Sequence, residues 1–361
     1  MSFVIPFLIA FCLSFILTPV FGYLARKYGF VDDPKKRKHP AILHKRMVPR
    51  AGGLPIFLAF VIAAFLAVPI GQKVIGIILG GGLLVLAGLY DDRFDLGSYR
   101  KLLIQAVAAS IVVAGGVGIS FITNPFYSFG ASASQVIRLD SLRIIFDFFG
   151  THSIVVLADL FAIFWIVWVI NMVNFSSGVD GQMPGIVIIV LMVIFVVSLR
   201  YWPPDAEQLI VSRLALAGVG ATLGFLIFNF YPAKIFPGDS ASYFLGFLVA
   251  VLSIASGAKV GAAILVMAVP LIDGVFTVIR RIAQRRSPFL GDRGHLHHRL
   301  LEIGWGQRRV ALFYWLLCAI LGAIALSLTS VEKLFAGLIV AIIVLGGLLW
   351  INMSLLLKGR A

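Results

Sequence analysis

Apolar runs of about the length needed to cross a bilayer, ~20 residues, recur along the whole chain. We interpret eleven of them as transmembrane helices separated by polar loops. Their ranges are 3–24, 51–70, 74–90, 102–121, 153–173, 183–199, 209–228, 241–255, 260–279, 310–328 and 334–357. The pattern predicts an all-α, polytopic membrane protein with about 11 transmembrane helices, forming a single domain over residues 1–361.

Lys and Arg residues lie mostly on one side of these helices. That side receives loops 25–50, 91–101, 174–182, 229–240 and 280–309 and the tail from Lys358, which hold 23 of the 30 Lys and Arg residues. The positive-inside rule places this side in the cytoplasm, so we expect the N-terminus outside and the C-terminus cytoplasmic. Segment 122–152 is then external, and its Gly, Ser and Asn turns around short apolar runs predict a small hairpin and a helix.

The composition supports this class of protein. The chain is 60% hydrophobic and 13% charged, with a mean hydropathy of +1.03, which leaves no room for a soluble domain of normal size. The net charge of +14 is assigned to loops that face anionic headgroups, and no nucleic-acid partner is expected. Cys12 and Cys318 fall inside predicted spans, which excludes a disulfide framework or zinc site. Residues 3–25 lack a basic start and a cleavage site, which indicates a first span rather than a signal peptide.

Four polar patches interrupt the apolar pattern, all on the predicted cytoplasmic side: 89–93, 171–181, 236–239 and 295–298. The first contains Asp91 and Asp92 at the end of a span. Adjacent helical residues point about 100° apart, so at most one of these carboxylates faces a given ligand. Acids at a helix C-terminus oppose the helix dipole, which favours a compensating ligand. A solvated helix end is the alternative.

The second patch places Asn171 and Asn174 one turn apart on the same helix face, followed by Asp180 in a Gly-Val-Asp-Gly break. Two amides and an acid can bind a base or sugar edge and help to hold a cation, although amides packed between helices are the alternative. In the third patch, Gly238 and Asp239 directly precede another span and are placed at the start of its helix. This arrangement suits phosphate or Mg²⁺ binding, with a simple helix N-cap as the alternative.

The fourth patch is the most specific. Arg293 precedes His295, His297 and His298, and imidazole with guanidinium is a combination suited to pyrophosphate. The His spacing also suggests zinc, but no Cys accompanies it, and a basic interfacial loop remains an alternative. Lys45 lies in a basic loop that leads to Pro49 and a Gly-Gly pair at a span entry, where it could hold a lipid phosphate.

Together these motifs resemble the polyprenyl-phosphate N-acetylhexosamine-1-phosphate transferases from about Asp32 to Gly306. The stretch from Ser287 to the His-Leu-His-His motif is similar to the GlcNAc-1-phosphate branch, because the phospho-MurNAc-pentapeptide branch typically has three successive histidines there. Eleven spans and a cytoplasmic tail also resemble the GlcNAc-1-phosphate branch. One departure is Ser177, which stands where the family pattern has an Asp.

The resemblance implies three groups of functional residues. The catalytic residues are Asp91, Asp92, Asp239, His297 and His298. Mg²⁺, with Mn²⁺ as a substitute, is held by Asp239, Asp92 and Asp180. The substrate-binding residues are Lys45, Asn171, Asn174, Asp180, Arg293 and His295.

The implied reaction transfers HexNAc-1-phosphate from a UDP-N-acetylhexosamine, expected to be UDP-GlcNAc, to undecaprenyl phosphate and releases UMP. We expect it in a bacterial inner membrane with a cytoplasmic active site, and a homodimer is one candidate assembly. A phosphate monoester, with a second pKa of about 6, is already mostly dianionic at neutral pH, which favours direct attack. A two-step route, with Asp92 as nucleophile, is the alternative.

Two competing functions remain open from the sequence. The first is phospho-MurNAc-pentapeptide transfer, within the same family. The second is transport of nucleotide sugars or cations. Transporters usually place acids near the membrane midplane, whereas here only Asp159 and Asp273 are clearly intramembrane carboxylates, and either can pair with a neighbouring helix.

Overall fold

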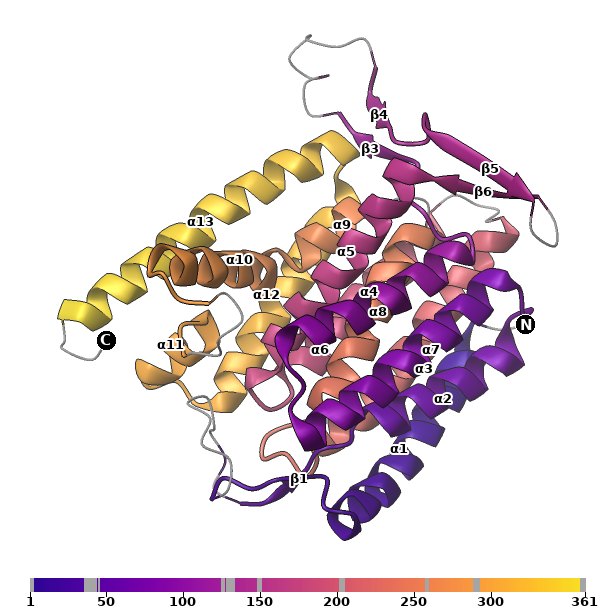
Figure 1. Ribbon diagram of the computed structural model, residues 1–361. Coiled ribbons are helices and arrows are strands. Elements are labelled where there is room, and N and C mark those ends of the chain that lie inside the picture. Colours follow the sequence, from indigo (N-terminus) through magenta and orange to yellow (C-terminus); the bar gives the residue numbers. More distant parts are fainter. Residues whose placement is uncertain are drawn as a thin grey trace.

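Helices make up most of the protein in the computed structural model (Figure 1). The structure describes residues 3–35, 44, 46–124, 127, 134–147, 151–200, 205–256, 260–287 and 293–357. The helices are α1 (Val4–Lys27), α2 (Gly53–Ala67), α3 (Gln72–Phe94), α4 (Ser98–Ala114), α5 (Val156–Phe175), α6 (Gln182–Ser198), α7 (Ala206–Asn229), α8 (Gly238–Ala255), α9 (Val260–Val266), α10 (Ala268–Ala283), α11 (Leu296–Glu302), α12 (Gln307–Ser327) and α13 (Ser330–Leu357).

Every predicted span falls on one or two of these helices. Within the described ranges, seven helices are long and apolar enough to cross a membrane, or eight if the bent pair α9–α10 counts as one span. Helices α2 and α6 are apolar but shorter. The chain is therefore a largely helical, multi-pass membrane protein, while the number of eleven spans and the orientation of the termini stay predictions.

Two predicted spans differ in detail from the helices found. The span 102–121 corresponds to α4, which ends at Ala114, because Gly115 and Gly116 follow and Gly116 takes a left-handed conformation with φ +95°. The span 260–279 is broken into α9 and α10, which meet at 77°. Pro270 lies next to this break and has no N–H to continue the helical hydrogen bonds.

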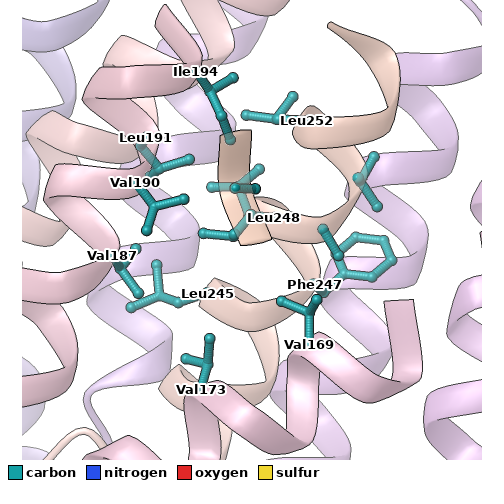
Figure 2. Close-up of a cluster of buried hydrophobic side chains, with 14 of the residues drawn as sticks. Val169, Val173, Val187, Val190, Leu191, Ile194, Leu245, Phe247, Leu248 and Leu252 are labelled. Atoms are coloured by element: carbon teal, nitrogen blue, oxygen red, sulfur yellow. The ribbon is translucent and has the colours of Figure 1, made fainter. Parts of the chain in front are cut away.

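Helix α8 forms the centre of the bundle, and every residue from Ser240 to Ile254 is buried. Figure 2 shows its Leu245, Leu248 and Leu252 among side chains of two neighbouring helices. These neighbours are Val169 and Val173 of α5, and Val187, Val190, Leu191 and Ile194 of α6. Because α8 is packed on all sides, the residues at its first turn are held in a fixed place.

Helix α3 approaches α8 closely through glycine. A Cβ on Gly88 would collide with the backbone of Asp239 and Ser240, so only glycine allows the two helices to lie this near each other. The next turn of α3 carries Asp91 and Asp92. The close approach therefore delivers both carboxylates to the start of α8.

Three short antiparallel sheets depart from the all-helical expectation. Strand β1 (Val31–Asp32) pairs with β2 (Val48–Pro49), β3 (Phe121–Thr123) with β4 (Val136–Arg138), and β5 (Arg143–Asp147) with β6 (Thr151–Val155). In Figure 1 the strands β3–β6 project at the top, at the other end of the bundle from β1 and α11. A hairpin was expected in segment 122–152, where the apolar runs are too short for spans; the helix expected beside it is not among the described elements.

Candidate functional site

Asp92 caps the N-terminus of α8. Its Oδ1 accepts a hydrogen bond from Asp239 N at 2.9 Å, and its Oδ2 accepts from Ser240 N at 3.4 Å and Ser240 Oγ at 3.2 Å. Gly238 makes this possible, because it has φ +67° and a Cβ there would collide with the Asp92 carboxylate. Arg50 Nε lies 2.9 Å from Asp92 Oδ1. Both oxygens of Asp92 are thus occupied by partners from the protein itself.

Arg50 reaches this point because its loop pairs with the segment before α8. Phe236 N donates to Pro49 O at 2.8 Å, and Gly52 N donates to Phe236 O at 3.2 Å. Burial opposes the charge of the Arg50 guanidinium, but the carboxylates of Asp92 and Asp239 outweigh it and raise the pKa above its ordinary value. Arg50 is therefore a permanent cation at the site.

Asp91 and Asp239 share Lys101. Lys101 Nζ lies 2.6 Å from Asp91 Oδ2 and 3.6 Å from Asp239 Oδ2, and Tyr243 OH donates to Asp91 Oδ2 at 3.1 Å. The side chain of Asp239 is 17% exposed, compared with 1% for Asp91 and 0% for Asp92. Asp239 is accordingly the carboxylate of the three that a ligand can reach most easily.

The two amides of α5 have different partners. Asn174 Nδ2 donates to Asp239 Oδ1 at 2.8 Å and to Ser242 Oγ at 2.7 Å, which joins the second polar patch to the third. Asn171 Nδ2 donates to Gln105 Oε1 of α4 at 2.7 Å. Asn174 therefore belongs to the carboxylate cluster, whereas the contact of Asn171 is of the helix-packing kind.

The loop after α5 brings Asp180 to the loop that precedes α8. Asp180 Oδ2 accepts a hydrogen bond from Ala233 N at 2.9 Å. Burial raises the pKa of Asp180, against the opposing effects of the Ala233 N–H and His44. Ser177, where the resemblance calls for an Asp, donates from its hydroxyl to Asn174 O at 2.6 Å and so closes the end of the helix.

The three histidines form a buried row. The rings of His295 and His297 stack at 5.5 Å with 5° between their planes, and those of His297 and His298 lie 4.3 Å apart. The His297 ring packs directly on Gly178, where a Cβ would collide with it. Burial, with additional repulsion from His298 and His295, lowers the pKa of His297 well below its usual value. The fourth patch thus meets the second, with His297 neutral.

Arg293 and Lys45 are the remaining predicted site residues. Arg293 is exposed just before the histidine row, and Lys45 lies outside the described residues. Arg50, Lys101 and Tyr243 were not predicted as site residues. Arg50 and Lys101 lie at the ends of the first and second loops, next to a span. For Lys101 this position was the only signal, whereas Arg50 also stands in the basic stretch beside Pro49 and the Gly-Gly pair.

The carboxylate oxygens of the cluster are the kind of ligand that Mg²⁺ prefers. Within the described part of the chain, no group of three or more His, Cys, Asp or Glu side chains converges as a metal-binding set. Mg²⁺ sites commonly use one or two carboxylates together with substrate phosphates and water. Asp239 and Asp91, which already share one cation in Lys101, meet that description. Asp92 meets it less well, because its oxygens are engaged.

Comparisons with known proteins agree with the motifs. The family model "Glycosyl transferase family 4" matches residues 74–257, a range that contains all three clustered carboxylates. A probable undecaprenyl-phosphate N-acetylglucosaminyl 1-phosphate transferase of Bacillus subtilis is 30% identical over 339 residues, covering 91% of this chain and 85% of the relative.

Two other relatives match over similar lengths. A decaprenyl-phosphate N-acetylglucosaminephosphotransferase of Mycobacterium tuberculosis is 31% identical over 349 residues, covering 86% of this chain and 78% of the relative. A phospho-N-acetylmuramoyl-pentapeptide-transferase of Clostridioides difficile is 29% identical over 337 residues, covering 88% and 95%.

Proposed function

This chain belongs to glycosyl transferase family 4, and from that premise we propose that it transfers N-acetylglucosamine 1-phosphate from UDP-GlcNAc to a polyprenyl phosphate, releasing UMP. The observation that carries the proposal is the cluster of Asp91, Asp92 and Asp239 with Arg50 and Lys101 at one end of the apolar helices. A phosphoryl transfer between two anionic substrates needs such positioned cations and metal-binding oxygens.

The charges of the cluster argue for a bound divalent cation. Three carboxylates lie beside two cationic side chains, so with all three carboxylates ionised the cluster has a formal charge of −1, which would repel phosphates. Asp239 and Asp91 would hold Mg²⁺, with Asn174 orienting Asp239 through its 2.8 Å hydrogen bond. When bound, Mg²⁺ supplies positive charge to the diphosphate of the UDP-sugar.

Lys101 and Arg50 are placed to bind the acceptor phosphate. Arg50 contacts Asp92 and Lys101 contacts Asp91 at the end of the apolar helices. A lipid phosphate would reach the protein at this end. The acceptor is already mostly dianionic at neutral pH, so it can attack the β-phosphorus directly and needs only orientation. Asp92 is an unsuitable covalent nucleophile, because α8 and Arg50 engage both of its oxygens.

We further propose that the protein resides in a bacterial inner membrane, with this site facing the cytoplasm. The Lys and Arg distribution supports this orientation. The site residues come from all five predicted cytoplasmic loops, because the start of α8 at Gly238 and Asp239 lies in the fourth. UDP-sugars are cytoplasmic metabolites, so the site would then lie where its donor is found.

The deciding experiment uses purified full-length protein in detergent with undecaprenyl phosphate, MgCl₂ and radiolabelled UDP-GlcNAc. The expected result is label in the organic phase and an equal amount of UMP in the aqueous phase. A panel with UDP-GalNAc and UDP-MurNAc-pentapeptide identifies the sugar. Transfer from UDP-MurNAc-pentapeptide alone would assign the chain to the other branch of the family, and uptake of intact UDP-GlcNAc into liposomes without UMP release would indicate a transporter.

A further inference from the structure

One face of α10 forms polar contacts with the segment that carries the histidines. Asp273, Thr277 and Arg280 are spaced at i, i+4 and i+7 and so lie on the same side of the helix. Arg280 Nη1 donates to Gly294 O at 3.3 Å, and Thr277 Oγ1 lies 3.4 Å from His295 Nδ1. The polar side chains on this face of α10 therefore bind another segment of the same protein, the one that leads into the histidines.

Asp273 makes the two shortest of these contacts. Its Oδ1 accepts a hydrogen bond from Leu296 N at 2.8 Å, and its Oδ2 lies 3.1 Å from His295 Nδ1. Asp273 and His295 are only 4% and 6% exposed. An ionised carboxylate can only accept hydrogen bonds, so His295 must carry a proton on Nδ1 in this arrangement. Asp273 thus selects the protonation site of the imidazole as well as its orientation.

The orientation of His295 is passed on to the loop after α5 through stacked rings. His295 stacks on His297, and His297 packs on Gly178. Phe175, at the end of α5, also packs against the ring of His295, with the two ring centroids 5.4 Å apart. Contacts therefore run without a gap from α10 to the segment between Asn174 and Asp180, which flanks the carboxylate cluster.

We propose that Asp273 is a positioning residue for the transfer reaction: by fixing His295 through Nδ1 it holds His297 against Gly178 and so sets the part of the site that binds the UDP-sugar. The inference rests on the proposed function. It places on α10 a determinant of donor binding that has no direct role in binding the acceptor phosphate near Arg50 and Lys101.

The test is Asp273→Asn in the full-length protein. In the amide one of the two accepting oxygens becomes an NH₂ donor, so in this geometry Leu296 N and a protonated His295 Nδ1 no longer each face an acceptor, and the imidazole must move its proton or its ring. We expect the KM for UDP-GlcNAc to rise about 10-fold or more, with the KM for undecaprenyl phosphate changed less than about twofold. A loss of folded protein alone would lower the maximal rate per milligram of protein and would leave both KM values unchanged.

Asp159→Asn is the matched control. Asp159 Oδ2 also accepts a backbone hydrogen bond, from Val155 N at 2.9 Å, but it lies in the first turn of α5, at the far end from Asn174. Both KM values should stay at the wild-type level in this variant. A second probe, His295→Gln, removes the same contact from its other partner and decides the matter if Asp273→Asn fails to fold.

The double variant Asp273→Asn/His295→Gln tests whether Asp273 acts through His295. If it does, the double variant binds UDP-GlcNAc about as poorly as the worse single variant. A double variant whose defect equals the product of the single defects overturns the inference, as does a normal KM for UDP-GlcNAc in either folded single variant. Wild-type protein that transfers no label at all would instead refute the proposed function, and this inference with it.

Discussion

The three clustered carboxylates differ in what their oxygens already contact. Both oxygens of Asp92 contact the first turn of α8 or Arg50, whereas Asp91 Oδ2 contacts Tyr243 and Lys101, the cation that Asp91 shares with Asp239. Asp239 lies farther from Lys101, with 3.6 Å between Oδ2 and Nζ, and its side chain is the most exposed of the three at 17%. The three aspartates therefore have different roles. Asp92 holds the start of α8 and Arg50 in place, and Asp239 is the carboxylate best placed to contact a ligand.

Asp239→Asn should remove nearly all transfer activity while the protein remains folded. A neutral amide replaces a hard anionic oxygen donor poorly at a Mg²⁺ site, yet it can keep the hydrogen-bonding geometry with Asn174. The measurement is label transfer across a MgCl₂ titration, with the thermal unfolding midpoint as the check on folding. Turnover close to that of the wild type would refute the assignment of Asp239 as the principal ligand.

Arg50→Lys should reduce activity about 10-fold or more, because one ammonium cannot replace the guanidinium contacts to both Asp92 and Asp239, and losing one charged hydrogen bond is worth about 1.5–3 kcal/mol. Arg46→Lys is the matched control, since Arg46 is exposed in the same loop. Steady-state rates of the two variants at saturating UDP-GlcNAc make the comparison. Equal rates would show that the fork of Arg50 is dispensable.

At the scale of elements, the position of α8 depends on α3 in two ways. The glycine contact brings α3 close, and Asp92 of α3 accepts hydrogen bonds from the first amides of α8. Helices α4 and α5 are joined in another way, by the hydrogen bond between the buried Gln105 and the half-buried Asn171. The first contact builds the site, whereas the second holds two helices together about one turn before α5 ends at Phe175.

Replacing both amides should therefore preserve function. Asn171→Leu alone leaves Gln105 buried without its partner and should lower the free energy of unfolding by about 1–3 kcal/mol. The double variant Gln105→Leu/Asn171→Leu should recover most of that stability and keep the KM for UDP-GlcNAc within about twofold. Asn174→Leu, in contrast, should abolish transfer. A double variant that is stable but inactive would show that Asn171 binds substrate, as the sequence pattern suggested.

At the scale of the whole molecule, all four polar patches gather at one end of the bundle. The cluster of acids and cations connects through Asn174 and Gly178 to the histidine row. The hairpins β3–β4 and β5–β6 lie at the opposite end (Figure 1). This polarity makes the sidedness of the protein in the membrane a direct test of where its chemistry takes place.

A cysteine introduced at Arg286 should be shielded from a membrane-impermeant thiol reagent in intact cells, and one at Ser141 should react. Both positions are exposed, so the difference reports the side of the membrane. The unmodified chain serves as control, because Cys318 is buried and Cys12 lies within α1. Labelling of the Arg286 position from outside would overturn the cytoplasmic site.

Incubation with UDP-GlcNAc and Mg²⁺ but without lipid should leave no phosphosugar on the protein and release no burst of UMP. The direct route predicts this because the acceptor phosphate is itself the nucleophile. Rapid quenching followed by UMP quantification makes the measurement. A burst equal to the enzyme concentration, lost in Asp92→Asn, would establish the two-step route instead.

Hydrophobic pattern and charge distribution were sufficient to predict a helical multi-pass membrane protein and the four polar patches, because burial in lipid demands long apolar helices whatever their partners are. The motifs were also sufficient to identify the family and its reaction. These features are local, so they can be read along the chain. The start of α8 at Gly238 and Asp239 is an example, since it occurs in the structure where the pattern placed it.

Only the tertiary structure decided which polar residues share a site. Asn171 and Asn174 look alike in the sequence, yet one pairs with Gln105 and the other with Asp239. Arg50 and Lys101 are two among many basic loop residues until their loops fold against Asp92 and Asp91. Asp273 and His295 are 22 positions apart and meet because the residues at the start of α11 contact one face of α10. Such pairings depend on how the helices pack, and packing is set by contacts between segments distant in the chain, which no local pattern contains.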